Sequence, residues 1–314
     1  MEEEEKFKDS EEKVELIEKE LGFEESFAVP GVRLMNKDGS LNVHFVGSKR
    51  FRKWNLYKRF INMSALNFFL SILSLYIILN LLFATFYYCF GENGLSISNS
   101  EFSWLNCFWF SCQTFTTVGY GHISPSSMIV NIVSGFEAFI GLIFFAIATG
   151  VVYGRFTNSK VDLRFSENIL INYQGKCPTL TCRLANAYDS ELSDLEAILI
   201  MSYTEKKGDR VGRRYKKLTL ELGTITILST SWTLEHKILD NSPCNLLLDK
   251  KKIQGLEFLV FISAFDEIYD QKVKFRTSYL GEEVIDSAMF EPITSYSAEK
   301  TVVDLEKLSS YQKI

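Results

Sequence analysis

The chain has 314 residues, of which 46% are hydrophobic and 23% charged, and its net charge at pH 7 is −5. This length accommodates two domains of ordinary size, each with its own core. The six cysteines form no Cys-x-x-Cys pair and have no metal-type spacing to the three histidines, which argues against a zinc site or a redox motif. No nucleophile–base pair or phosphate loop is recognisable, so we expect no enzyme, no cofactor, no resident metal and no nucleic-acid partner.

The cysteines are expected to be reduced thiols, with a bridge between Cys89 and Cys107 as the less favoured alternative. Residues 1–48 form an N-terminal segment, and its first 26 or so residues are an acidic tail whose composition predicts that it is solvated. No basic start followed by an apolar core is visible, so we expect no signal peptide.

Two apolar stretches predict a pore domain at residues 63–157 with membrane spans at 64–88 and 127–156. The first contains 24 consecutive uncharged residues, which as a helix reach about 36 Å and cross a hydrocarbon core. The second contains one acid, Glu137, and ends near Arg155. Lys and Arg precede the first span and follow the second, but none lies between Cys89 and Ser127. The positive-inside rule therefore predicts that both termini are cytoplasmic.

Residues 158–290 consist of short alternating runs broken by polar turns, a texture typical of a β-sandwich, and residues 291–314 are expected to be a C-terminal tail. The predicted fold class is therefore a multidomain membrane protein, with a two-span α-helical pore domain, a re-entrant pore loop and a cytoplasmic all-β domain.

Between the spans, an aromatic-rich segment at residues 102–115 is too short to cross a membrane and predicts a pore helix. A hexapeptide that resembles a potassium selectivity filter follows it at once: Thr116, Thr117, Val118, Gly119, Tyr120 and Gly121. Potassium sheds its water only where rings of carbonyl oxygens replace the hydration shell. The two glycines permit the φ values that turn successive carbonyls toward one axis, and such backbone is tolerated in a membrane only where it lines a cavity.

In this filter Thr117 can add its hydroxyl to the inner site, while Val118 and Tyr120 are expected to pack against the pore helix. A turn beside a strand is the alternative reading, which the position between two spans disfavours. One chain supplies one loop and a filter needs a closed ring, so we expect a homotetramer with K⁺ as the permeant ion.

Three further segments resemble the inward-rectifier potassium channels, especially their prokaryotic members. With the filter, the resemblance covers about residues 30 to 290. It implies an immunoglobulin-like cytoplasmic domain and an interfacial slide helix at residues 49–62. The three segments are Val32 to Gly47 (VRLMNKDGSLNVHFVG), Ser231 to Leu247 (SWTLEHKILDNSPCNLL) and Phe261 to Tyr279 (FISAFDEIYDQKVKFRTSY).

The slide helix finds support in aromatic and apolar residues near helical spacing among Lys and Arg, which suits an interface over anionic lipid. Ordinary juxtamembrane charge that fixes topology is the alternative. The resemblance implies gating by anionic lipids, without saying whether lipid opens or closes the channel. The corresponding positions here are Arg50, Arg52, Lys53, Arg155 and Lys160.

The resemblance also maps an inner gate to Tyr153, where four rings could close the pore. Gly141 and Gly150 are candidate hinges, but the spacing of Gly150 and Gly154 equally suits close helix packing.

Departures from the family concern four positions. Phe145 stands where strong rectifiers carry an acid in the cavity, which puts strong rectification in doubt. Gln113 replaces a common pore-helix acid, and we expect it to support the filter. His122 follows the filter where prokaryotic members usually have Asp; it could sense pH, or be exposed without effect. Glu137 is costly inside a membrane, so we expect it to support the filter scaffold by hydrogen bonding, with an accident of topology as the alternative.

These expectations combine in a potassium-selective channel of the inward-rectifier type, passive, homotetrameric, gated at the inner helix bundle and modulated by anionic lipids. The alternative is an electrically silent lipid-sensing or scaffolding subunit, which the intact filter disfavours. Voltage gating is disfavoured because no Arg-rich membrane segment exists. We expect a multi-pass protein of the cell membrane, and resemblance alone favours the bacterial inner membrane.

Overall fold

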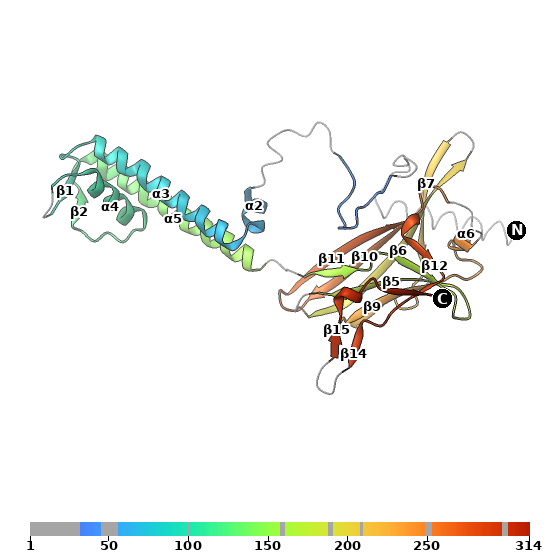
Figure 1. Ribbon diagram of the computed structural model, residues 1–314. Helices are drawn as coiled ribbons and strands as arrows, with labels where there is room; N and C mark the ends of the chain where they lie inside the picture. Colours follow the sequence, from blue (N-terminus) through green and yellow to red (C-terminus); the bar gives the residue numbers. More distant parts are fainter. Residues whose placement is uncertain are drawn as a thin grey trace. The chain divides into compact units, whose positions relative to one another are not determined.

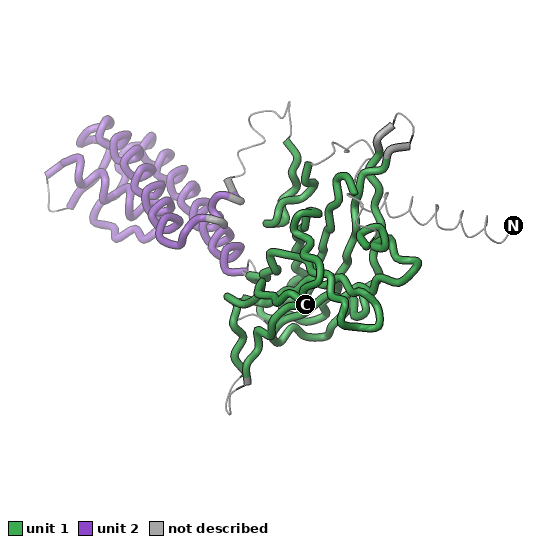
Figure 2. Tube along the Cα trace, turned by 45° about the vertical axis from the view of Figure 1, so that its right-hand side comes forward, with its two compact units in different colours: residues 1–46, 159–314 green, residues 47–158 purple. Residues whose placement is uncertain are grey.

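The computed structural model describes residues 32–44, 56–98, 101–157, 161–187, 191–207, 210–248, 253–296 and 301–314. The chain divides into two compact units, one comprising Met1–Val46 with Ser159–Ile314 and the other Gly47–Asn158 (Figure 2). The first unit is built of strands and the second of helices (Figure 1).

The helical unit contains a long helix pair with a short helix and a two-stranded ribbon between them. Its elements are α2 (Leu56–Asn62), α3 (Ala65–Cys89), β1 (Leu95–Ile97), α4 (Trp104–Phe115), β2 (Ile123–Pro125) and α5 (Met128–Phe156). Serine hydroxyls cap the three longer helices, because the side chains of Ser64, Ser103 and Ser127 each accept a hydrogen bond from a backbone N–H three residues on. Ser103 is extended, which is why α4 begins at Trp104 and not at the expected residue 102.

Helices α3 and α5 are long and apolar enough to cross a membrane. Only 17% and 11% of their most apolar windows are buried within the chain, whereas a core helix of a soluble protein would be mostly covered. These apolar surfaces need lipid or other subunits around them. Of the expected slide helix, α2 covers residues 56–62, and residues 49–55 lie outside the described part of the chain.

The β unit is a sandwich of two five-stranded sheets, as the alternating runs predict. One sheet has the order β11-β10-β6-β7, with β8 also on β6, and the other has the order β12-β4-β5-β3, with β9 also on β5. The sandwich strands are β3 (Leu163–Phe165), β4 (Ile169–Asn172), β5 (Thr179–Asn186), β6 (Leu192–Lys207), β7 (Arg210–Leu218), β8 (Thr224–Ile227), β9 (Ser231–Lys237), β10 (Glu257–Asp266), β11 (Gln271–Leu280) and β12 (Val284–Asp286). The smaller elements are α6 (Asn245–Leu248), η3 (Gly281–Glu283), β13 (Ala288–Phe290), β14 (Thr294–Tyr296), β15 (Thr301–Val303), η4 (Leu305–Lys307) and β16 (Tyr311–Lys313).

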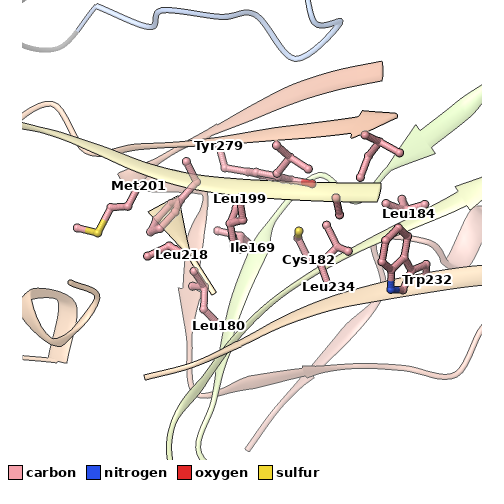
Figure 3. Packing of buried hydrophobic residues seen from close by; sticks show 14 of the residues in the cluster. Ile169, Leu180, Cys182, Leu184, Leu199, Met201, Leu218, Trp232, Leu234 and Tyr279 are labelled. Atoms are coloured by element: carbon pink, nitrogen blue, oxygen red, sulfur yellow. The ribbon is translucent and has the colours of Figure 1, made fainter. Parts of the chain in front are cut away.

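The core lies between the two sheets, where alternate residues of each strand point inward (Figure 3). Leu180, Cys182 and Leu234 come from one sheet, and Leu199 and Tyr279 from the other. All six cysteines of the chain are free, which agrees with the expected reduced thiols. Burial raises the pKa of Cys182 and of Cys244 to about 12, so both behave as small apolar side chains.

The last residues belong to the sandwich, although the sequence suggests a tail from residue 291. Strand β16 pairs with β13, and Leu308 is buried against Ala185 and Ile293. The guanidinium of Arg183 on β5 donates to the carbonyls of Glu291 and Leu308 over 2.6 to 3.1 Å. A buried arginine more than 100 residues away holds this segment, which no local pattern reveals.

Candidate ion-conduction pathway

Gln113, in the last turn of the short helix α4, holds the backbone that follows it. Its carbonyl oxygen accepts hydrogen bonds from the N–H groups of Val118 (2.9 Å) and Gly119 (3.3 Å). Its side-chain Oε1 accepts from the N–H of Tyr120 (3.2 Å), and Nε2 donates to the carbonyl of Ile123 (3.2 Å). An ionised acid at this position has no N–H to donate, so the amide fits this loop as a carboxylate could not.

Alternate residues of the hexapeptide have left-handed backbone: φ is 57° at Thr117, 55° at Gly119 and 86° at Gly121. The glycines meet this demand without steric cost, as the sequence predicts. Thr117 is β-branched, and its positive φ is an uncommon, strained conformation that the sequence does not announce.

The N–H groups of Val118, Gly119 and Tyr120 donate to Gln113, whereas the carbonyl oxygens of the same stretch have no such partner. Within the described chain, the carbonyl oxygens of residues 117–121 accept no hydrogen bond. Five consecutive acceptors are thus available to replace water around a cation.

The residues of segment 117–121, called the filter strand below, alternate between two cavities. Thr117, Gly119 and Gly121 line a cavity of about 450 Å³ together with residues of α5. Val118 and Tyr120 line another, of about 360 Å³, behind the strand. Val118 is 54% and Tyr120 77% exposed within one chain, so this chain does not bury their apolar side chains.

Glu137 of α5 is fully buried and joins three helices. Its carboxyl oxygens accept hydrogen bonds from the hydroxyls of Tyr87 on α3 and Ser111 on α4, each at 2.5 Å. The hydroxyl of Ser111 also lies 3.1 Å from Oδ1 of the buried Asn80. Glu137 thus bonds to α4, the helix that carries Gln113.

The sequence analysis did not single out Tyr87, Ser111 or Asn80 as partners of Glu137. A signal was present, because Asn80 and Tyr87 are seven residues apart in α3 and therefore share one face of that helix. A polar residue and a tyrosine on one face of an apolar span predict a buried polar contact.

Two of the three glycines at issue are packing positions. A Cβ atom on Gly141 would collide with the carbonyl oxygen of Phe115, so α4 ends directly on α5 there. A Cβ on Gly154 would lie 2.7 Å from the hydroxyl oxygen of Tyr57 on α2. Within the described part of the chain, no atom lies within 4 Å of a Cβ on Gly150, so Gly150 is the hinge candidate that remains.

At the C-terminal end of α5, Tyr153 is 70% exposed within the chain. Arg155 turns back along the helix, since its Nη1 donates to the carbonyls of Phe60 (3.2 Å) and Ile61 (3.1 Å) at the end of α2. Its guanidinium also lies 5.4 Å from the ring centre of Phe68. Arg155, expected to meet lipid, thus already holds α2 onto α5.

Of six further expected site residues, two make few contacts and four lie outside the described part of the chain. Phe145 stacks edge to face with Phe115 and remains 45% exposed. His122 is exposed, its ring lies 6.2 Å from that of Tyr120, and its carbonyl accepts from Ser98 where β1 and β2 pair. The remaining lipid candidates, Arg50, Arg52, Lys53 and Lys160, lie outside the described residues.

A short helix and an extended loop between two membrane-spanning helices define an ion channel, and a family model described as "Ion channel" matches residues 75–158. A second model, "Inward rectifier potassium channel C-terminal domain", matches residues 163–314. The chain is 32% identical over 283 residues to inward rectifier potassium channel Kirbac3.1 of Paramagnetospirillum magnetotacticum, which covers 88% of this chain and 94% of that one. The chain therefore belongs to the inward rectifier potassium channel family, of the prokaryotic type, and the predicted family and fold class are confirmed.

More distant relatives agree. ATP-sensitive inward rectifier potassium channel 10 of Rattus norvegicus is 25% identical over 66% of this chain and 58% of its own length. Among solved structures, the sporulation control protein Spo0M of Bacillus subtilis aligns with 40% of this chain and 49% of its own at 14% identity and a TM-score of 0.21. A likeness that low carries no argument. The family is one of ion channels and not of enzymes, as expected.

Proposed function

We propose that four copies of this chain surround one axis and conduct K⁺ passively through rings of carbonyl oxygens from residues 117–121. The observation that carries the proposal is the one-sided hydrogen bonding of this strand. Gln113 accepts hydrogen bonds from the N–H groups of residues 118–120. No group of the described chain donates to the carbonyl oxygens of residues 117–121. A cation that has lost its water is the partner that such a row of acceptors suits.

The fourfold assembly follows from what a single chain lacks. One strand supplies one side of a coordination shell, so a ring needs several copies. The exposed side chains of Val118 and Tyr120 offer each neighbour an apolar surface to cover. Helix α4 ends at Phe115, directly before the strand, and the negative end of its dipole favours a cation below the filter.

Gating belongs to the inner end of α5 in this proposal. Four exposed Tyr153 rings close the pore when α5 is straight, and Gly150, with free space around it, lets the helix bend. Anionic lipid binds the basic residues Arg50, Arg52, Lys53 and Lys160, while Arg155 carries the movement from α2 to α5. Both termini are cytoplasmic, in a bacterial inner membrane.

The cavity has no acid at Phe145, so blocking cations bind weakly there and rectification by that route is slight. His122 is the residue that we propose for pH sensing, because it follows the filter directly and its side chain is exposed. The measurement is the pH dependence of conductance, which His122→Gln is expected to reduce.

The test is uptake of radioactive rubidium by proteoliposomes, with sodium as competitor and with the anionic lipid fraction varied. Uptake that resists sodium and depends on anionic lipid supports the proposal. If the wild-type chain is silent, Tyr153→Ala decides between a shut gate and a non-conducting subunit. Uptake released by Tyr153→Ala means a shut gate, and continued silence favours the lipid-sensing subunit.

A further inference from the structure

The outer face of the sheet β11-β10-β6-β7 is covered along only part of its length. At the start of β10, Glu257 and Leu259 are fully buried, and Leu34 and Met35 of the N-terminal segment 32–44 lie over this part of the sheet. Further along the same face, Phe261, Ser263 and Phe265 are only half-buried. The part of the sheet around these three residues is called the open half below.

A buried ion pair fixes where the N-terminal segment enters this face. The carboxylate of Glu257 accepts the N–H groups of Leu34 and Met35 over 2.9 to 3.2 Å and pairs with Arg213 at 2.5 Å. Arg213 also donates to the carbonyl of Val32 over 3.1 Å. The residues that precede Val32 therefore leave from a fixed point on the same sheet face.

The open half is bordered by cations on the edge strand β11. Lys272, Lys274 and Arg276 stand opposite Phe265, Ser263 and Phe261 in the antiparallel register, so all share one face. The three cations, called the basic stripe below, are exposed, and their charged groups have no ion-pair or hydrogen-bond partner in the described chain. The open half thus joins half-buried aromatic rings to unpaired positive charge.

The chain carries a complementary segment within reach. Residues 1–26 contain twelve acidic and four basic residues. The chain from Glu25 to Val32, seven residue steps, spans up to about 24 Å when extended. The six steps from Leu259 to Phe265 in β10 span about 20 Å. Every part of the basic stripe is therefore accessible to the acidic tail.

We propose that the acidic tail, residues 1–26, docks on the basic stripe and covers the open half of the sheet. Its carboxylates pair with Lys272, Lys274 and Arg276, and its apolar residues such as Phe7 and Leu16 lie on Phe261 and Phe265. Tethering at Val32 makes the docking intramolecular, so weak contacts suffice at the high effective concentration. Because exposed charges supply the attraction, salt weakens it. The docking does not depend on the conduction proposed above.

Zero-length coupling of carboxylates to amines with a carbodiimide tests the contact in the reconstituted full chain. Mass spectrometry is expected to find cross-links from acids of residues 1–26 to Lys272 and Lys274. Raising the salt from about 0.05 M to about 0.5 M is expected to cut their yield at least about fivefold, since the screening length shrinks below the charge spacing. Equal cross-linking to the exposed Lys176 and Lys237 of the other sheet, or yields that do not change with salt, would overturn the proposal.

A binding measurement with matched variants completes the test. A fluorescent peptide of residues 1–26 is added to a channel variant from which only residues 1–26 have been removed, called the parent channel. We expect Lys272→Gln/Lys274→Gln to weaken binding about tenfold. The control Lys176→Gln/Lys237→Gln removes as much charge from the other sheet and should change binding less than about twofold. Equal binding by both variants contradicts the proposal. So does no binding by the parent channel, the result expected if a neighbouring subunit covers the basic stripe.

Discussion

Among the described residues two glutamates, Glu137 and Glu257, are fully buried, and their surroundings differ between the two units. In the β unit, Glu257 faces the guanidinium of Arg213 and two backbone N–H groups. In the helical unit, Glu137 faces only the hydroxyls of Tyr87 and Ser111. The pair in the sandwich anchors a distant segment of chain, whereas the carboxyl in the membrane ties three helices together without a cation.

The difference indicates which substitutions destabilise each unit most. Removing one charge of a buried pair strands the other, which costs far more than the loss of a neutral hydrogen bond. The helical unit avoids that risk and depends instead on close backbone contacts, such as Gly141 against Phe115. In residues 117–121 it leaves the carbonyl oxygens without a hydrogen bond from the described chain.

Glu257→Gln has the largest expected effect on stability. It leaves Arg213 buried without an ionic partner and weakens the hold on Leu34 and Met35, so we expect a cost of about 3–5 kcal/mol. The midpoint of thermal unfolding of the purified channel reports it. The control Glu221→Gln breaks an exposed pair with Lys237 and should cost about 0–1 kcal/mol. Similar midpoints for the two variants would contradict the role of the buried pair.

Gly141→Ala comes next. The added Cβ pushes the end of α4 away from α5, at a cost of about 1–3 kcal/mol. Gly150→Ala adds the same methyl group where space is free and should stabilise α5 by up to about 1 kcal/mol. The midpoint of thermal unfolding of the purified channel in detergent compares the two. Equal behaviour of both variants refutes the close contact at Gly141.

Glu137→Gln is expected to cost less than Glu257→Gln, about 1–2 kcal/mol, because no cation is stranded. Tyr87→Phe removes one of the same hydrogen bonds and should cost a similar amount. The double variant should cost less than the sum of the two, since both act on one contact. Additive losses in thermal unfolding would mean that the two groups act separately.

Arg155→Gln has the smallest expected effect, about 1 kcal/mol, from two lost bonds to α2 carbonyls. Arg164→Gln, which breaks an ion pair exposed on both sides, should change stability by less than about 0.5 kcal/mol. Protease cleavage within residues 56–62 reports release of α2. Cleavage that is as fast in Arg164→Gln as in Arg155→Gln would contradict the conclusion that Arg155 holds α2 in place.

The sequence predicts best what is local and periodic. Uninterrupted apolar runs predict α3 and α5 to within one residue at their ends, and the glycine spacing predicts the left-handed turns at Gly119 and Gly121. The positive φ of Thr117 was not predicted, because nothing in its neighbours marks a strained β-branched residue. It accompanies the hydrogen bonds that the N–H groups of Val118 and Gly119 donate to the carbonyl oxygen of Gln113.

Contacts between distant residues could not be predicted. Glu257 meets Leu34 across 223 positions, and Arg183 holds Leu308 across 125, so neither leaves a trace in a local window. Arg155 illustrates the same limit, since its charge suggests lipid whereas its partners are carbonyls of α2. The identities of these residues are visible in the sequence, but their partners depend on the tertiary fold.

The most direct test of the account is to locate bound ions in the filter. Crystals of the tetramer grown with rubidium and measured at the rubidium absorption edge should show a row of anomalous peaks on the fourfold axis, each ringed by carbonyl oxygens of residues 117–121. Crystals grown with sodium should lack that row, and so should Gly119→Ala. Rubidium bound only at side-chain carboxylates, or peaks unchanged in Gly119→Ala, would contradict the claim that these carbonyls select the ion.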